Sequence, residues 1–150
     1  RNAWVTIGDQ EVARIGHGAL ILVGVERGDT PADAQYLAEK SARLRIYNDE
    51  QGQLNAAIDA VSGSFLVVSQ FTLCADCRKG NRPSYINASD PETADELYNH
   101  FAACLRTASG RRVEQGRFRE HMIVGLENDG PVTILLERSG RKRMLENGGV

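Results

Sequence analysis

The segment that most constrains the fold is a near-continuous apolar run, Ala19–Val25. The run has the length of a strand, with Gly16–Gly18 before it and Gly28-Asp29 after it. A strand that is apolar at nearly every position buries both of its faces, whereas a half-buried strand alternates. The run therefore predicts a central, buried strand, and Phe65–Leu73 is the next strong strand.

Four shorter segments complete the expected strands. Ala3–Ile7 alternates between apolar and polar residues, and Gly8-Asp9 supplies a tight turn into Glu11–Ile15, which predicts a β-hairpin. Met122–Glu127 and Val132–Glu137 are two further expected strands near the end of the chain, and a short polar turn joins them.

Two helices are expected, and the first begins at Thr30-Pro31. Thr30 suits the N-cap, Pro31 the first helical position, and Asp33 the place where a carboxylate favours a helix N-terminus. One face with helical spacing is expected to be buried, and its members are Ala34, Leu37, Ser41 and Leu44.

The second helix is expected to begin at a capping box, Ser89–Glu92, and to end at Gly110. Its buried stripe is expected to consist of Leu97, Phe101, Leu105 and Ala108. Many strands joined by short turns, together with two helices, predict an α+β fold with a curved, mostly antiparallel sheet or small barrel.

The charge balance limits the kind of partner. The net charge is −2 and the sequence pI is about 5.9, whereas proteins that coat a duplex are usually basic. Any nucleic-acid contact should therefore be small and local. No apolar run has the length of a membrane span. The odd cysteine count of three favours a reduced, cytoplasmic setting over a disulfide framework.

Common catalytic and metal-binding motifs do not occur in the sequence. There is no Gly-x-Ser-x-Gly elbow, no His-Glu-x-x-His helix and no phosphate-cradling loop. Cys74–Cys77 has C-x-x-C spacing, but a zinc site needs a second pair of ligands. We interpret these cysteines as incidental thiols, and we expect no metal and no cofactor.

Two polar segments are the candidate sites. Ser69-Gln70-Phe71-Thr72-Leu73 closes a strand, and a long polar loop spans residues 74–90 after it. Strand ends that open onto loops are common places for sites. Asn128-Asp129-Gly130-Pro131-Val132-Thr133 has the composition of a β-turn. Each segment, taken alone, favours a purely structural interpretation.

Taken together, the two segments resemble the two signature motifs of the D-aminoacyl-tRNA deacylase family. The similarity runs from about Ala3 to Glu137 in the same order and with similar spacing. It includes these further segments: Gly24-Val25-Glu26, Tyr36–Lys40, Asp76–Ser84, and Gly116-Arg117-Phe118 followed by Met122. The resemblance implies a deacylase domain over residues 1–137, with the family's first strand absent before residue 1.

The resemblance also implies a homodimer with active sites at its interface, each completed by the partner's Gly130-Pro131 turn. Asn128, Val132 and Thr133 belong to the same substrate-facing motif. The family's Gly-Pro peptide bond is cis, and its main-chain carbonyls exclude L-residues. Glycine has no side chain to exclude, so the implied substrates are D-aminoacyl-tRNA and glycine mischarged on tRNA(Ala).

The implied reaction is hydrolysis of the ester at the tRNA 3′ end. By resemblance, backbone N–H groups near Phe71 and Thr72 stabilise the oxyanion, while Gln70 and Ser69 shape the pocket for the terminal adenosine. Thr72 has no adjacent base to activate it as a nucleophile. The mechanism implied instead uses the terminal 2′-hydroxyl to activate water.

Basic residues suggest where the tRNA backbone lies. Arg78, Lys79 and Arg82 are candidate phosphate contacts, with a solvated charged loop as the alternative. Residues 138–150 form a basic, glycine-rich tail that is expected to be disordered. A second phosphate contact is an alternative role for this tail.

Three other functions stay open at this point. One is a deacylase of L-alanyl- or glycyl-tRNA, and another is a non-catalytic nucleic-acid binding module. The third is a structural homodimer with a vestigial pocket.

Overall fold

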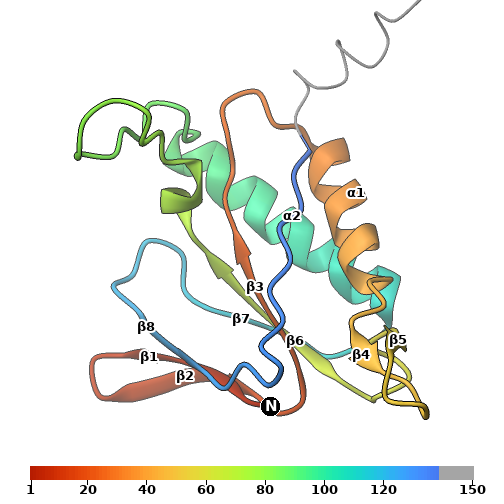
Figure 1. Cartoon of the computed structure of the whole chain (residues 1–150). Helices are drawn as coiled ribbons and strands as arrows, with labels where there is room; N and C mark the ends of the chain where they lie inside the picture. The colour runs from red at the N-terminus through yellow and green to blue at the C-terminus, as the bar shows by residue number, and fades with distance from the viewer. Residues whose placement is uncertain (139–150) are drawn as a thin grey trace, which may run out of the picture.

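The computed structural model describes residues 1–138, which contain two α-helices, eight strands and one short 3₁₀ turn (Figure 1). The elements in chain order are β1 Ala3–Ile7, β2 Gln10–Ile15, β3 Gly18–Val23, α1 Pro31–Ala42, β4 Tyr47–Asn48, β5 Leu54–Ala56, β6 Ser64–Ser69, η1 Phe71–Cys74, α2 Pro91–Ser109, β7 Val113–Gln115 and β8 Ile123–Leu126. The expected tail beyond residue 138 lies outside the described residues.

The expected N-terminal hairpin is confirmed. β1 and β2 pair antiparallel with Ala3 opposite Ile15, and β8 pairs antiparallel with the other edge of β1. The resulting sheet has the order β2-β1-β8. Within it, Gly125 lies beneath the ring of Trp4, which leaves no room for a side chain at position 125.

The predicted antiparallel pairing is confirmed in two sheets, β2-β1-β8 and β4-β5, but the remaining sheet is parallel. β3, β6 and β7 are all parallel, in the order β3-β6-β7. The described strands form separate sheets rather than a closed barrel. The buried central strand is therefore β6, and the apolar run Ala19–Val25 lies at the edge, where Leu22 is 42% exposed.

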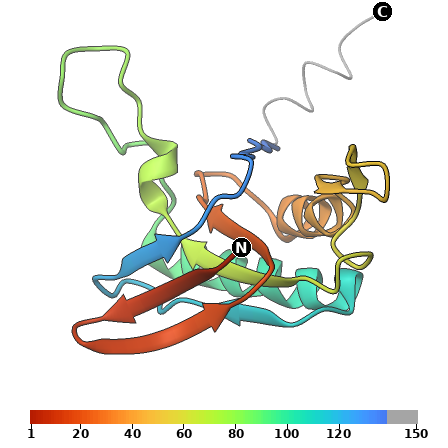
Figure 2. The ribbon, with the colours of Figure 1, turned by 60° about the horizontal axis from the view of Figure 1, so that its bottom comes forward.

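β6 lies between two layers and contributes to both cores (Figure 2). Phe65 and Val67 pack against the helices, with Ala38 of α1 and Phe101 of α2. The alternate residues, Leu66 and Val68, pack against the β1–β2–β8 sheet. The alternation of side chains along a strand thus holds three layers together through one element.

The start of α1 matches the sequence prediction. Thr30 is the N-cap, Pro31 opens the helix, and the capping box between Thr30 and Asp33 is formed. The Asp33 carboxylate accepts hydrogen bonds from the Thr30 backbone N–H at 3.0 Å and from its hydroxyl at 2.7 Å. The most buried apolar residues are instead Ala38 and Ala42, because small side chains let α1 approach α2 closely.

The second helix begins one residue later than predicted. Asp90, not Ser89, is the N-cap, and its carboxylate accepts from the Thr93 N–H at 2.9 Å. Gly110 ends the helix in the left-handed conformation, as expected. Leu97, Phe101 and Leu105 are buried as predicted, but Ala108, in the last turn of the helix, is exposed.

Several strand assignments differ from expectation. β6 ends at Ser69, and Phe71–Cys74 is a 3₁₀ turn rather than strand. β4, β5 and β7 were not anticipated, because strands of two or three residues are too short to show a pattern. Residues 132–137 form no strand in the structure, although they follow the course of β3 (Figure 1). The part of the chain that the structure describes contains no helix long and apolar enough to cross a membrane.

The close contact of β3 with β6 gives a stability prediction. A Cβ on Gly18 would overlap the carbonyl oxygen of Ser64, whereas a Cβ on Gly16 meets nothing within 4 Å. We expect Gly18→Ala to lower the free energy of unfolding by roughly 1–3 kcal/mol and Gly16→Ala to change it by less than about 0.5 kcal/mol. Urea unfolding followed by the fluorescence of Trp4 measures both. Equal stabilities for the two variants would contradict the assignment.

Candidate functional site

The carboxyl ends of three parallel strands meet at one edge of the molecule. Ser69, at the end of β6, pairs with Val23 at the end of β3, and Val67 pairs with Gln115 at the end of β7. Ligands bind preferentially beyond the carboxyl ends of parallel strands. The predicted segment Ser69–Leu73 begins at this edge.

The backbone turns sharply directly after Ser69. The Gln70 N–H still donates to the Val23 carbonyl at 2.8 Å, and the Leu73 N–H donates back to the Gln70 carbonyl at 3.2 Å. The Gln70 side-chain amide donates to the Thr72 hydroxyl at 2.5 Å. The first N–H groups of a helical turn have no partner within it, so those of Phe71 and Thr72 are the donors that this turn offers to a ligand.

Gly24 is a site residue to which the sequence analysis gave no role. A Cβ there would lie 2.9 Å from the Leu73 Cβ, 3.2 Å from the Cys74 sulfur and 3.3 Å from the Gln70 carbonyl oxygen. Only glycine lets the end of β3 approach the 3₁₀ turn this closely. The clue in the sequence is a glycine that interrupts an otherwise apolar run.

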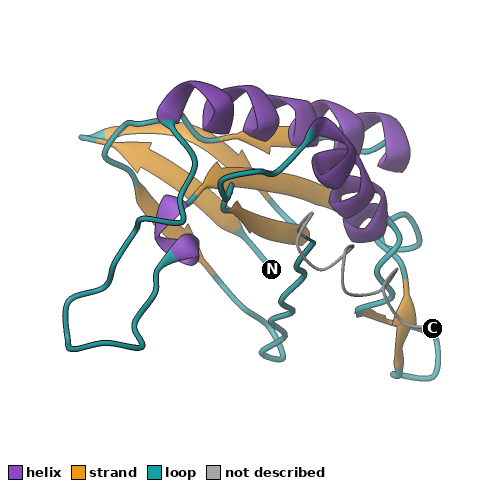
Figure 3. Cartoon of the chain, turned by 90° about the horizontal axis from the view of Figure 1, so that it is seen from above, coloured by secondary structure: helices purple, strands orange, loops and turns teal. Residues whose placement is uncertain are grey.

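An exposed aromatic pair stands beside the turn. The rings of Phe71 and Tyr85 meet edge to face, with centroids 5.1 Å apart, and the two residues are 58% and 40% exposed. Tyr85 belongs to the 75–90 loop, which projects from the body of the molecule (Figure 3). Within residues 1–138 no histidine or carboxylate hydrogen-bonds to Thr72, so the structure offers this hydroxyl no base.

The second predicted segment is a rigid turn built by Asn128. Its side-chain oxygen accepts from the Val132 N–H at 2.9 Å, and its amide donates to the Thr133 hydroxyl at 3.2 Å. Inside this frame the Gly130-Pro131 peptide bond is cis, and Gly130 has a φ of 144°. Asparagine, glycine and proline thus each have a specific part in shaping the turn.

The two predicted segments lie at opposite ends of β6. The Ser64 N–H at the start of β6 donates to the carbonyl of His17 at 3.0 Å. β1 connects this end to the turn, because Ala3 pairs with both Ile15 and Leu126. The Arg1 guanidinium, at the start of the chain, lies 2.7 Å from the carboxylate of Asp129. The Asn128–Thr133 turn therefore lies beside the start of β6, while Ser69 ends it. A strand of six residues spans about 17 Å, so one chain does not bring the two segments together.

Comparisons with known proteins identify the family. The sequence profile of D-Tyr-tRNA(Tyr) deacylase matches residues 1–137. The chain belongs to this family. A D-aminoacyl-tRNA deacylase of Desulforudis audaxviator is 55% identical over 133 residues, 89% of each chain, and one of Desulforamulus reducens is 51% identical over 133 residues, also 89% of each.

Solved structures agree on the fold of the deacylase family. The chain resembles a protein described as c-Myc DNA Unwinding Element Binding Protein, with a TM-score of 0.86 and 34% identity over 93% of this chain and 94% of the other. A probable eukaryotic D-amino acid tRNA deacylase has a TM-score of 0.71 at 16% identity, covering 84% and 88%, which supports the fold alone. The predicted family is thus confirmed.

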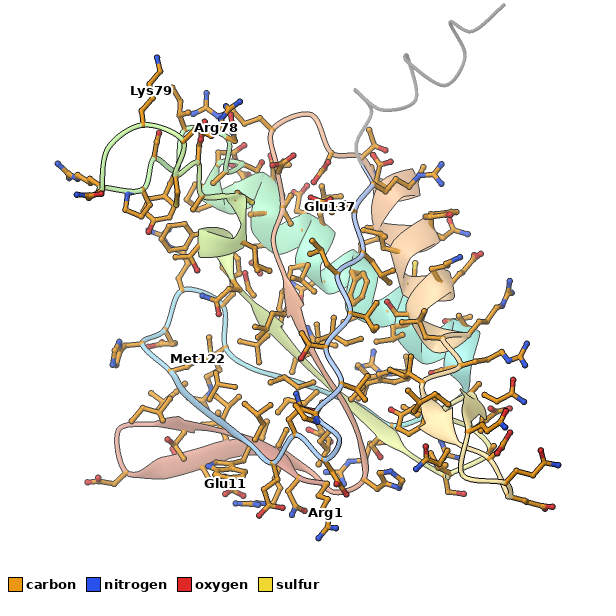
Figure 4. All side chains as sticks on the ribbon, viewed as in Figure 1. Arg1, Glu11, Arg78, Lys79, Met122 and Glu137 are labelled. Atoms are coloured by element: carbon orange, nitrogen blue, oxygen red, sulfur yellow. The ribbon has the colours of Figure 1, made fainter. Side chains whose placement is uncertain are left out.

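The loop after the Ser69–Leu73 segment contains the three predicted phosphate contacts. The Arg78 side chain is paired with Asp76 at 2.5 Å, so its charge is already partly neutralised. Lys79 and Arg82 are exposed, and Lys79 extends outward from the loop tip (Figure 4). The structure therefore leaves Lys79 and Arg82 more available to an anion than Arg78.

Arg138, the first residue of the tail that was expected to be disordered, forms two defined contacts. Its guanidinium lies 3.3 Å from the carboxylate of Asp33 and stacks over the Tyr36 ring at 3.8 Å. The Asp33 side chain is only 3% exposed. Arg138 thus anchors the C-terminal segment, residues 128–138, to the start of α1.

A cavity of about 1190 Å³ lies between β3, α1 and this C-terminal segment. Ala34, Leu37, Ser41 and Leu44, the helix face that was expected to be buried in the core, line it. It ends near Leu73 and Cys74 but does not include Ser69–Thr72. Across the segment, Ile134 and Leu135 are 52% and 75% exposed.

The cysteines and histidines form no catalytic or metal cluster in the described residues. Cys74 is buried, Cys77 is exposed, and both are free thiols. Burial raises the pKa of Cys74, which makes it a poorer nucleophile. No group of three or more metal-binding side chains occurs within residues 1–138.

The loop ion pair gives a prediction about pH. The Arg78 guanidinium lowers the pKa of Asp76 from 3.8 to about 2. A carboxyl group with a lowered pKa stabilises the fold above pH 3.8, and this contribution is lost as the pH falls through about 2. An NMR titration should give a midpoint near 2, and Arg78→Ala should return it toward 3.8. Lys79→Ala is the control, and a midpoint that both variants leave unchanged would contradict the pairing.

Proposed function

We propose that the protein hydrolyses the ester bond of D-aminoacyl-tRNA and releases free tRNA and the D-amino acid. Water adds to the ester carbonyl, the bond to the ribose oxygen breaks, and that oxygen takes a proton. Family membership and the exposed 3₁₀ turn at the carboxyl edge support the proposal. The reaction requires no cofactor, and it belongs to the cytoplasm, where tRNA is charged.

The backbone of the 3₁₀ turn supplies the stabilising donors. The N–H groups of Phe71 and Thr72 stabilise the oxyanion, a contribution of about 3–4 kcal/mol for one well-placed donor. Gln70 and Ser69 shape the pocket for the terminal adenosine. Because Thr72 has no base partner, it acts through its hydrogen bond with Gln70 and not as a nucleophile. The 2′-hydroxyl of the terminal ribose activates the water.

Chiral selection requires a second copy of the chain. The observation that carries this step is that the two motifs lie at opposite ends of β6, a strand of six residues and therefore about 17 Å long. In a symmetric homodimer, the Gly130-Pro131 turn of one copy reaches the Ser69–Thr72 site of the other. Exposed apolar residues beside the turn, such as Leu135, suit such an interface.

The Gly130-Pro131 turn then acts as a steric filter. Asn128, Val132 and Thr133 hold its backbone in place through the hydrogen bonds of the turn. A backbone pressed against the α-carbon accepts hydrogen there and rejects a side chain, so L-residues are excluded. Glycine offers two hydrogens, and glycine mischarged on tRNA(Ala) is therefore a second substrate.

A second candidate function is binding of nucleic acid without catalysis. The similarity to a protein described as a DNA unwinding element binding protein favours it. The net charge of −2 favours the hydrolase, because proteins that coat nucleic acid are usually basic.

Hydrolysis of D-tyrosyl-tRNA beside L-tyrosyl-tRNA, without added metal, tests the function. We expect rapid loss of the D-ester while the L-ester is untouched, because only the D-residue presents hydrogen to the filter. Release of free tyrosine measures both rates. Equal hydrolysis of the two esters would contradict the filter, and hydrolysis of neither would favour the binding function.

Complementation tests whether the site is shared between two copies. Phe71→Pro removes a proposed oxyanion donor at a helix position that accepts proline, and Gly130→Val blocks the filter. We expect each variant alone to be inactive, because every site in its homodimer carries the defect. Random mixing of subunits should restore about a quarter of the wild-type sites.

Phe71→Leu is the matched control for the donor, since it keeps the N–H and removes only the ring. We expect it to retain far more activity than Phe71→Pro, by a factor on the order of 10². Mixed subunits that stay inactive, in a sample whose exchange is verified by mass, would show that each chain holds a complete site.

A further inference from the structure

A turn with two exposed arginines lies at the same edge as the candidate site. It follows β7 and spans Arg117–Glu120, closed by a hydrogen bond from the Glu120 N–H to the Arg117 carbonyl at 3.4 Å. Arg117 and Arg119 are exposed, and neither forms an ion pair within residues 1–138. Glu120 is the one acidic residue of the turn, so cationic charge dominates it.

The strand register places this turn beside the Ser69–Leu73 segment. The Gly116 N–H donates to the Val67 carbonyl at 2.9 Å, two residues before Ser69 on the neighbouring strand. The Tyr98 hydroxyl donates to the same carbonyl at 2.8 Å, and the ring of Phe118 lies 6.1 Å from the Tyr98 ring. The base of the turn is thus anchored, and its arginines remain in solvent.

The figures agree with this placement. The segment between β7 and β8 lies on the same side of the molecule as η1 and the 75–90 loop (Figures 1 and 2). Met122, at the end of the segment, lies below that loop (Figure 4). A Cβ on Gly116 would lie 2.9 Å from the Met122 sulfur, so the two ends of the segment are close together.

The backbone of Arg119 is unfavourable for its residue type. Its φ is 64°, in the left-handed region that favours glycine at this position of a turn. Arginine is therefore present at a cost to stability, although glycine would fit the backbone better. Strained residues of this kind occur preferentially where a side chain has a function.

We propose that Arg117 and Arg119 bind phosphates of the tRNA acceptor end while its terminal ester occupies the Ser69–Thr72 site. The proposal rests on the proposed deacylase function and adds a second contact surface to it. Lys79 and Arg82 lie on the exposed loop that follows η1 at the same edge. Arginine suits phosphate because its planar fork donates two parallel hydrogen bonds.

This arrangement also explains how an acidic protein holds an RNA. Phosphate contacts supply affinity and position without reading sequence, and only a few are needed when the ester itself is held by the backbone. The cations of the turn after β7 and of the loop after η1 supply those few contacts near the Ser69–Thr72 site.

Binding of deacylated tRNA over a series of salt concentrations tests the proposal. We expect the double variant Arg117→Ala/Arg119→Gly to bind roughly tenfold more weakly. The slope of log affinity against log salt should fall by about 0.7–0.9 for each contact removed. Arg119→Lys, which keeps the charge, should retain most of the binding.

Arg119→Gly separates function from folding. Glycine relieves the unfavourable φ, so we expect a higher melting temperature together with weaker tRNA binding. Arg43→Ala is the matched control, since Arg43 is exposed beyond the far end of α1 and forms no ion pair in the described chain. It should leave tRNA binding unchanged.

A minimal substrate, the 3′ ester of D-tyrosine with adenosine, contains no phosphodiester. The arginine variants should raise KM for D-tyrosyl-tRNA, leave kcat unchanged and hydrolyse the minimal ester at the wild-type rate. Unchanged tRNA binding, or an equal loss on the minimal ester, would overturn the proposal. A wild-type protein that cleaves neither ester would instead refute the deacylase function.

Discussion

The burial of β6 on both faces is the constraint on which the rest of the structure depends. Phe65 and Val67 face the helices, while Leu66 and Val68 face the N-terminal hairpin. A single strand thereby joins three layers, and its neighbours β3 and β7 run parallel to it. The positions of both candidate motifs follow from this strand, since one begins where it ends and the other lies beside its start.

The parallel sheet concentrates the chemistry at one edge. The backbone N–H and C=O groups at the ends of β3, β6 and β7 need hydrogen-bond partners. The turns after these strands supply some of these partners and leave other backbone groups free for a ligand. Gly24 permits the tight approach that this edge requires. The candidate site is consequently made largely of backbone, which is consistent with the proposed selection by backbone contacts rather than by side-chain identity.

The C-terminal segment is held by side-chain contacts at its two ends and not by strand pairing. Asn128 holds its first turn, and Arg138 fastens its other end to Asp33 and Tyr36. Between these points Ile134 and Leu135 are largely exposed. A segment that is fixed at both ends and apolar between them can hold the Gly130-Pro131 turn rigid, as the proposed homodimer requires, without forming a strand of its own.

Local features were readable from the sequence alone. The N-terminal hairpin, the capping box of α1, the glycine stop of α2 and the two motifs all depend on residues close together in the chain. Tertiary structure decided the parallel pairing of β3 with β6, the edge position of Ala19–Val25, the short strand β7 and the placement of Arg119. It also decided that the two motifs lie at opposite ends of one strand. These features depend on contacts between distant segments, because strand order and burial on both faces of a sheet are settled by packing and not by local pattern.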